Sequence, residues 1–347
     1  MTHLLRVRGL TVELPTPAGW VQPVNEVSLR IADGESVGLV GESGSGKTMM
    51  ALALMGLLPV GARVSGEATL SGEANSGGRA AAADRTSREV MVNTSVAANR
   101  SDINLAGLNE RGWRKVRGRE IAMVFQEPMT ALNPVMRIGS QIAEAIRAHH
   151  SRLDSGQVRR RVLEALQRAA VPEPETRAEQ FPHQLSGGLR QRAMIAMALA
   201  GGPRLLIADE PTTALDVTVQ KQILDLLDRL RRELRLGLLF ITHDLGVVAQ
   251  VADRVAVMYC GRIVEEGAAH EVLRAPRHPY TQGLLAASPT LERGKLKPIP
   301  GTVPQLTALP PGCAFEPRCP LRIENCVRAV PDLRPASQDH AARCILV

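Results

Sequence analysis

Aromatic side chains are scarce in this sequence, which contains four phenylalanines, two tryptophans and two tyrosines among 347 residues. It also has no apolar run near the roughly 18 residues that a membrane-spanning helix needs; the best candidates are 193–200 and 236–241. The first residues have neither the apolar stretch nor the small-residue cleavage site of a secretory signal. With 44% apolar residues the chain can still build a core. We therefore expect a cytosolic protein that does not itself cross a membrane.

The net charge of +7 does not by itself indicate a nucleic-acid partner. The basic residues are scattered, with small clusters at 111–119 and 159–161. No aromatic side chains alternate with them, as a base-stacking platform would require. We expect a solvated or partner-facing surface and no nucleic acid among the partners.

The octapeptide GESGSGKT fits the phosphate-binding pattern G-x-x-x-x-G-K-[ST]. A strand-like run at 36–40 enters it and a helical pattern at 49–58 leaves it. In such a loop, backbone N–H groups surround the β- and γ-phosphates, the lysine reaches the terminal phosphates and the threonine binds Mg²⁺. An accidental match arises in about one chain in a hundred of this length. The sequence predicts a nucleotide phosphate site at Gly41, Glu42, Ser43, Gly44, Ser45, Gly46, Lys47 and Thr48.

Strand and helix patterns alternate along most of the chain and predict a mainly parallel α/β sheet. Strand-like runs lie at 4–12, 24–31, 64–70, 121–125, 205–208, 237–241 and 255–259. Helical patterns lie at 138–149, 157–170 and 190–199. Residues 72–103 are rich in Ala, Ser, Asn, Gly and Arg, which predicts a surface insertion without stable packing. From about residue 298 the chain becomes rich in proline and cysteine and loses clear periodicity.

Further polar groups follow the later strands. A buried-strand pattern at 205–208 ends in Asp209 and Glu210, placed to hold Mg²⁺ through water and to polarise an attacking water. His243 follows the strand at 238–242, where an imidazole can bond the γ-phosphate, and Gln126 follows Phe125.

A second anion site is predicted at the sequence QLSGGLRQR, residues 184–192. Ser186 and the two glycines after it offer bare N–H groups at a helix N-terminus. One chain cannot readily bring both phosphate sites to the same nucleotide. The pattern therefore requires a second subunit.

The ordered set GESGSGKT, Gln126, LSGGLRQR, LLIADEP, TALD and ITHD resembles the nucleotide-binding subunit of ATP-binding-cassette (ABC) transporters over residues 4–290, apart from the insertion. Segments 121–134, 194–199 and 278–281 and the tail from 298 are similar to the dipeptide/oligopeptide permease ATPases. The MIAMAL signature helix resembles the first of the two ATPase subunits that usually pair.

The resemblance implies a P-loop NTPase fold of the ABC type over residues 1–290, with a RecA-like parallel-sheet core, a β-subdomain and a helical subdomain at about 127–200. A cysteine-rich extension would follow at 291–347. It also implies that the chain is the ATP-hydrolysing motor of a di- or oligopeptide importer at the cytoplasmic face of the cell membrane. The expected partners are a second ABC ATPase, two transmembrane permease subunits and an extracytoplasmic solute-binding protein.

Residue roles follow from the same resemblance. Residues 41–48 would cradle ATP, with Thr48 and Gln126 at Mg²⁺ and Asp209 supporting the metal. Glu210 would be the general base and His243 the γ-phosphate switch, while Gln126 would link the metal and attacking water to the transmembrane partner. The residues expected at ATP held on the opposite subunit, or at the dimer seam, are Ser186, Gly188 and Asp216.

Other functions stay open at this point. The importer could carry nickel or a sugar instead of peptides. A soluble ABC ATPase acting on nucleic acid or ribosomes usually has two cassettes or a long coiled coil, and this sequence shows neither. A purely regulatory nucleotide-binding module is a further alternative, but it would not need Glu210 and His243. Two departures from the family pattern also stand out. Leu14 occupies the place of the adenine-stacking aromatic, with Trp20 nearby, and the 72–103 insertion is longer than expected.

Four of the five cysteines lie in the last 35 residues, whereas Cys260 stands alone after a strand pattern. A reducing cytosol disfavours disulfides, so clustered thiols there more often bind metal. Structural zinc favours closer C-x₂₋₄-C pairs than the intervals of five, six and seventeen residues found here. We therefore expect a [4Fe–4S] cluster, with zinc or free thiols as the alternatives. The expected ligands are Cys313, Cys319, Cys326 and Cys344.

Overall fold

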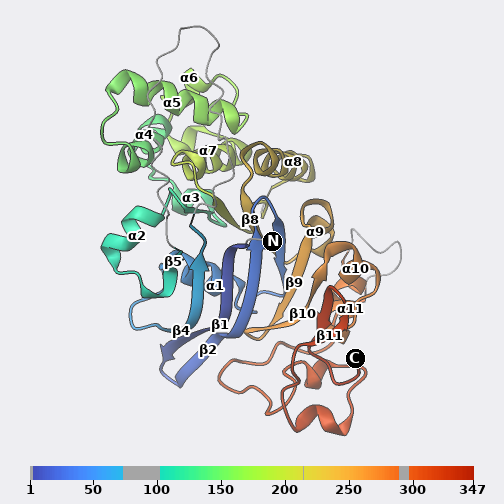
Figure 1. The fold of residues 1–347 in the computed structure, drawn as a ribbon. Coiled ribbons are helices and arrows are strands. Elements are labelled where there is room, and N and C mark those ends of the chain that lie inside the picture. Colours follow the sequence, from blue (N-terminus) through green and yellow to red (C-terminus); the bar gives the residue numbers. More distant parts are fainter. Residues whose placement is uncertain (1–2, 73–101, 214, 289–296) are drawn as a thin grey trace.

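The computed structural model describes residues 3–72, 102–213, 215–288 and 297–347. Two sheets lie at the centre, a group of helices at one end and the C-terminal segment at the other (Figure 1). The predicted strands and helices are found close to their expected positions. The predicted insertion falls almost wholly on residues 73–101, outside the described part of the chain.

A smaller antiparallel sheet forms from the first hairpin and two later strands. In β2, Leu29 and Ile31 are buried while Arg30 between them is exposed, as the alternation of a strand with one covered face requires. In sheet order the strands are β2 (Gly19–Ala32), β1 (His3–Thr16), β4 (Arg63–Leu70) and β5 (Ile103–Asn104).

The larger sheet carries the phosphate-binding loop at its centre. Five neighbouring strands, β9-β3-β8-β7-β6, run parallel, and the remaining three add antiparallel to the edge formed by β9. Because β3 lies between β8 and β9, the loop that follows it emerges between their carboxyl ends. In sheet order the strands are β11 (Arg334–Ser337), β12 (His340–Ala342), β10 (Arg262–Ala268), β9 (Arg254–Tyr259), β3 (Ser36–Val40), β8 (Gly237–Thr242), β7 (Leu205–Asp209) and β6 (Ile121–Val124).

Helices cover the larger sheet and build the separate helical end. Helices α4 to α7 gather at that end, above the sheets in Figure 1. None of the helices in the described ranges is long and apolar enough to span a bilayer. The helices are α1 (Lys47–Met55), α2 (Glu110–Val116), α3 (Pro128–Ala131), α4 (Ile138–His149), α5 (Ser155–Arg168), α6 (Pro174–Ala178), α7 (Gly187–Leu199), α8 (Val217–Leu234), α9 (Leu245–Val251), α10 (Ala269–Arg274) and α11 (Pro279–Ala286).

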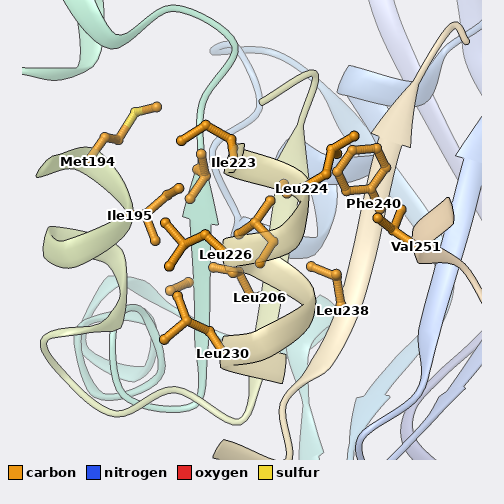
Figure 2. Packing of buried hydrophobic residues seen from close by; sticks show 14 of the residues in the cluster. Met194, Ile195, Leu206, Ile223, Leu224, Leu226, Leu230, Leu238, Phe240 and Val251 are labelled. Atoms are coloured by element: carbon orange, nitrogen blue, oxygen red, sulfur yellow. The ribbon is translucent and has the colours of Figure 1, made fainter. Parts of the chain in front are cut away.

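Alternate residues of the parallel strands enter two separate cores. Leu238 and Phe240 of β8 face α8 and α9, whereas Leu239 and Ile241 face α1 and the smaller sheet. Figure 2 shows leucines of α8, Leu226 among them, in the core that contains Leu238 and Phe240. Both faces of the sheet are therefore buried, which explains why its strands are apolar runs without alternation.

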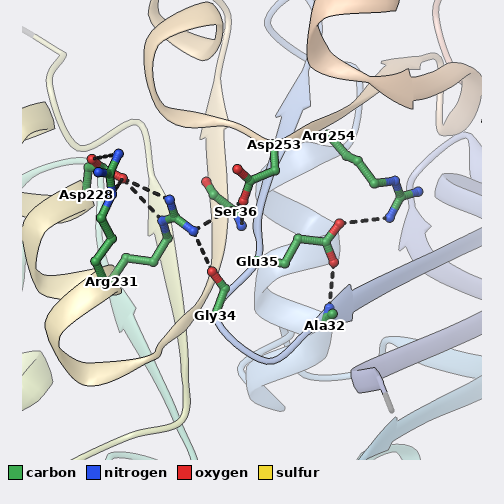
Figure 3. A network of polar contacts seen from close by, with 9 residues as sticks. Ala32, Gly34, Glu35, Ser36, Asp228, Arg231, Asp253 and Arg254 are labelled. Atoms are coloured by element: carbon green, nitrogen blue, oxygen red, sulfur yellow. Dashed lines mark hydrogen bonds and ion pairs between the residues drawn. The ribbon is translucent and has the colours of Figure 1, made fainter. Parts of the chain in front are cut away.

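A polar network fixes the start of β3. The Asp253 carboxylate accepts hydrogen bonds from the backbone N–H of Ser36 at 2.8 Å and from the Arg231 guanidinium at 3.2 Å (Figure 3). Glu35 accepts from the backbone N–H of Ala32 at 2.6 Å and from Arg254 at 3.3 Å. This network anchors the strand that leads directly into the phosphate-binding loop.

The C-terminal segment is less irregular than its sequence suggests. Two short strands continue the larger sheet: β12 pairs with β10 through Glu265↔Ala342 and Gly267↔His340, and β11 pairs with β12. Strands of four and three residues are too short to show a periodicity, which is why the sequence shows none beyond about residue 298.

Candidate functional site

The phosphate-binding loop is held by close backbone contacts. Gly46 has a φ of 107°, and a Cβ there would lie 1.9 Å from the carbonyl oxygen of Pro23. The carbonyl of Ser45 accepts the N–H of Gly261 at 2.9 Å, so the loop is tied to the turn between β9 and β10. α1 begins at Lys47, immediately after the loop, and directs its N-terminal N–H groups toward it.

Lys47 and Thr48 place a cation and a hydroxyl at the predicted phosphate and metal positions. Lys47 is 4% exposed, and its ammonium group donates to the carbonyls of Gly41 and Glu42 at 2.8 and 2.9 Å. The Thr48 hydroxyl lies 3.4 Å from Oδ1 of Asp209, at the end of β7. Hydroxyl and carboxylate oxygens are the ligands that Mg²⁺ prefers.

Glu210 is the centre of a cluster of four side chains from three segments of the chain. Its Oε2 accepts from Nε2 of Gln126 at 3.2 Å and from the Thr213 hydroxyl at 2.9 Å, and it lies 3.3 Å from Nδ1 of His243. The residue has a φ of 45°, a left-handed backbone conformation rare outside glycine. Three residues predicted separately from the sequence, Glu210, Gln126 and His243, are thus brought together beside Asp209.

The ionisation of this cluster follows from its contacts. Burial lowers the pKa of Lys47, and burial raises the pKa of Asp209 against the hydrogen bond from Thr48. The hydrogen bond with His243 lowers the pKa of Glu210, and the same bond raises the pKa of His243. The lowered pKa keeps the Glu210 side chain as a carboxylate.

The second predicted anion site lies on another element. Ser186 caps α7, accepting the N–H of Leu189 at 3.4 Å, and Asp216 caps α8, accepting the N–H of Val219 at 2.9 Å. A Cβ on Gly188 would lie 2.8 Å from Val219, so the two helix starts pack together. Within the described residues, no hydrogen bond or ion pair joins Ser186 or Gly188 to the phosphate-binding loop.

Residues 24–213 match the family model for ABC transporters, and residues 264–326 match the model for the oligopeptide/dipeptide transporter C-terminal region. The chain belongs to the ABC transporter family. It is an ATPase cassette of that family with the expected mixture of sheets and helices.

Relatives of the cassette match it over nearly its full length. A protein of Brucella ovis described as a putative peptide import ATP-binding protein is 48% identical over 99% of this chain and 96% of its own length. The oligopeptide transport ATP-binding protein OppD of Mycobacterium tuberculosis is 45% identical over 99% of this chain and 52% of its own.

Solved structures of other cassettes share the fold. The dimeric ATP-binding cassette MJ0796, in a post-hydrolysis state bound to ADP and Pi, has a TM-score of 0.61 and 26% identity, over 76% of this chain and 98% of its own. The cbiO1 cassette of Clostridium perfringens has a TM-score of 0.60 and 25% identity, over 79% and 92%.

Trp20, the aromatic residue close in sequence to Leu14, already contacts an arginine side chain. Pro15 pairs with Trp20 across the β1–β2 hairpin, next to the pair formed by Leu14 and Val21. The Trp20 ring is stacked under the Arg63 guanidinium, 3.9 Å from the ring centroid, and the residue is 46% exposed. The hairpin thus presents a cation-capped ring on the surface, whereas Leu14 offers no flat face.

The four cysteines of the tail line one small cavity of about 20 Å³. All four are free thiols, and Cys326 and Cys344 are buried. Burial raises the pKa of Cys313 to about 11, and the other three thiols contribute to this rise. In the described ranges no group of three or more Cys, His, Asp or Glu side chains is arranged to hold a metal ion.

Three side chains at the cassette site were not anticipated from the sequence. Thr213 bonds Glu210 from three residues downstream, a spacing that marks a tight turn and could have been found. The Tyr280 hydroxyl accepts the N–H of Glu42 at 2.8 Å, and Arg318 pairs with the Glu42 carboxylate. Neither Tyr280 nor Arg318 gives a local sequence signal, because the contacts span 238 and 276 residues.

Proposed function

We propose that this cassette binds ATP·Mg²⁺ at residues 41–48 and hydrolyses it with Glu210 as the general base. The observation that carries this proposal is the convergence of three donors on one oxygen of Glu210, directly after Asp209. A carboxylate held in this way is oriented as well as ionised. It can accept a proton from a water that attacks the γ-phosphorus.

The other residues take defined parts in this reaction. Lys47 leaves its loop carbonyls to reach the terminal phosphates, and the imidazole of His243 bonds a γ-phosphate oxygen. Gln126 positions the attacking water and links it to the transmembrane partner subunits. Mg²⁺, when bound, neutralises charge on the β- and γ-phosphates. Its donor set fits, because the Thr48 hydroxyl and the Asp209 carboxylate are 3.4 Å apart.

The separation of the two anion sites supports a head-to-tail dimer as the working form. Ser186 and Gly188 would contact ATP bound at the partner's loop, with Asp216 at the seam. Dimers are described for the MJ0796 cassette. The signature helix resembles the first of a pair of ATPases, so the physiological partner is a second, different cassette. A purified transporter with two copies of this chain and no other cassette would contradict the heterodimer.

The transported solute is a di- or oligopeptide. Relatives at 45–48% identity are described as peptide import or oligopeptide transport ATP-binding proteins, and the C-terminal region matches that family. The cassette would act at the cytoplasmic face of the membrane with two permease subunits and an extracytoplasmic binding protein. Uptake assays in proteoliposomes with the cognate subunits should show ATP-dependent entry of peptides, while entry of nickel or a sugar instead would reassign the solute.

Glu210→Gln tests the hydrolytic assignment because glutamine keeps the shape and loses the base. ATP binding should persist, turnover should fall by at least about 100-fold, and a closed dimer should accumulate with ATP in size-exclusion chromatography. Glu127→Gln is the matched control, since it removes an acidic group close in sequence to Gln126 with no place in the cluster. If the Glu210 variant hydrolyses ATP at the parent rate, the general-base assignment is wrong.

We also propose that the four tail thiols hold a [4Fe–4S] cluster. Four cysteine thiols line one cavity and are the donor set that such a cluster requires, although in this structure they are not arranged as a metal-binding group. The cluster would cross-link a segment with little apolar content of its own. Protein purified without oxygen should be brown and contain iron, and each cysteine-to-serine variant should lose iron. Colourless protein with one equivalent of zinc, or with no metal, would reject the cluster.

A further inference from the structure

The cysteine-rich tail reaches directly into the phosphate-binding loop through one ion pair. Arg318 donates from Nη1 to Oε2 of Glu42 at 2.7 Å and from Nη2 to Oε1 at 3.0 Å. The Arg318 side chain is only 4% exposed. Two parallel bonds in a nearly buried setting form the strongest and most directional kind of ion pair.

Arg318 is itself held from several sides. Its Nε donates to the carbonyl of Pro300 at 2.9 Å and its Nη1 lies 3.3 Å from the Tyr259 hydroxyl. Its guanidinium lies 5.9 Å from the ring centroids of Tyr259 and Phe315. These contacts fix the conformation of the Arg318 guanidinium, and the two hydrogen bonds from it fix the Glu42 carboxylate in turn.

Glu42 presents a problem that this arrangement solves. A carboxylate within a loop that binds phosphates repels the charge of the nucleotide. In this structure both of its oxygens are turned to Arg318, and its backbone N–H donates to the Tyr280 hydroxyl. The acidic side chain is thus neutralised and fixed by a residue that stands one position before Cys319.

We propose that Arg318 is a positioning residue of the nucleotide site, which neutralises Glu42 and makes the C-terminal segment part of that site. The proposal rests on the function proposed above, that residues 41–48 bind ATP. It does not depend on whether the tail thiols hold a metal. Arg318 would act by neutralising the charge of Glu42, so its effect on ATP affinity should depend on salt and on the Glu42 charge, whereas an effect of packing alone would not.

The test is a double-substitution cycle on the full-length protein, with ATP affinity measured by calorimetry. Arg318→Met should weaken ATP binding about tenfold, since it exposes the phosphates to an unpaired carboxylate. In the Glu42→Gln background the same substitution should cost less than about twofold, because no charge remains to repel. The loss in Arg318→Met should also shrink at high salt, and it should raise KM more than it lowers kcat.

Arg322→Met is the matched control, because Arg322 lies in the same segment and pairs with Glu316 at 2.8 Å without contacting the loop. It should leave ATP affinity at the parent value. If Arg318→Met folds poorly, Arg318→Lys can replace it, because lysine keeps the charge but cannot make both hydrogen bonds to Glu42. This variant should show an intermediate, salt-sensitive loss of ATP affinity. A loss that Glu42→Gln does not relieve, or no loss at all in protein that binds ATP, overturns the proposal. Absence of ATP binding in the parent protein would instead reject the proposed function.

Discussion

Glu265 of β10 is the buried carboxylate that joins the C-terminal segment to the cassette core, and its substitution gives a sharp prediction. The residue is 0% exposed. Its Oε1 accepts the backbone N–H of Arg277 and the ring N–H of His340, each at 2.6 Å, and its Oε2 accepts the N–H of His278 at 2.9 Å. One side chain therefore fixes both β12 and the start of α11.

Glu265→Gln cannot satisfy all of these donors. Because Oε1 serves two of them, the new amide N–H₂ must replace Oε2 and face the N–H of His278. The variant loses one charge-assisted hydrogen bond, worth about 1.5–3 kcal/mol, and buries two facing donors at a cost of about 1–3 kcal/mol. We expect the free energy of unfolding to fall by about 3–5 kcal/mol.

Urea unfolding followed by circular dichroism measures this loss. Glu266→Gln is the matched control, because the next residue makes a single long ion pair with Arg254 at 3.8 Å. Its cost should be under about 1 kcal/mol. His340→Ala should cost little more once Glu265 is already Gln, since the two share one contact. Equal urea midpoints for Glu265→Gln and Glu266→Gln would refute the conclusion that the Glu265 carboxylate joins the C-terminal segment to the core.

Three other substitutions test the site and its support. Lys47→Ala should weaken ATP binding by at least about tenfold in calorimetry, since it removes the loop's cation. Gly46→Ala should abolish ATP binding in a chain whose circular dichroism is otherwise native, because its Cβ would meet the Pro23 carbonyl at 1.9 Å. Burial lowers the pKa of His278 from its ordinary 6.5 to about 4. The unfolded chain therefore takes up the proton first as pH falls, and stability should drop by about 2 kcal/mol from pH 8 to pH 5, a loss that His278→Asn should remove in urea titrations.

Local sequence patterns were enough to predict which side chains stand at the ends of the parallel strands. Gln126, Glu210 and His243 each follow an apolar run, and parallel strands bring their carboxyl ends to one edge of a sheet. The three side chains accordingly meet, although they lie far apart in the sequence. The phosphate-binding loop was equally accessible, since its glycines and lysine act within eight consecutive residues.

The docking of the tail could not be predicted in this way. Arg318 meets Glu42 across 276 residues, and His340 meets Glu265 across 75. Neither pair lies in a periodic segment, and β11 and β12 are too short to leave a pattern. Single charged residues in a proline-rich stretch resemble solvated surface until the fold buries them.

These two buried pairs link the tail to the nucleotide site by separate routes. Glu265 holds the start of α11, which carries Tyr280 to the N–H of Glu42, while Arg318 holds the carboxylate of the same residue. Phe315 packs against both tyrosines, with its ring centroid 5.3 Å from that of Tyr280 and 5.4 Å from that of Tyr259. Coupling free energies are reciprocal. If the contacts of Arg318 and Tyr280 couple the two regions, a ligand bound at the four-thiol cavity should strengthen ATP binding by the same factor by which ATP strengthens the binding of that ligand.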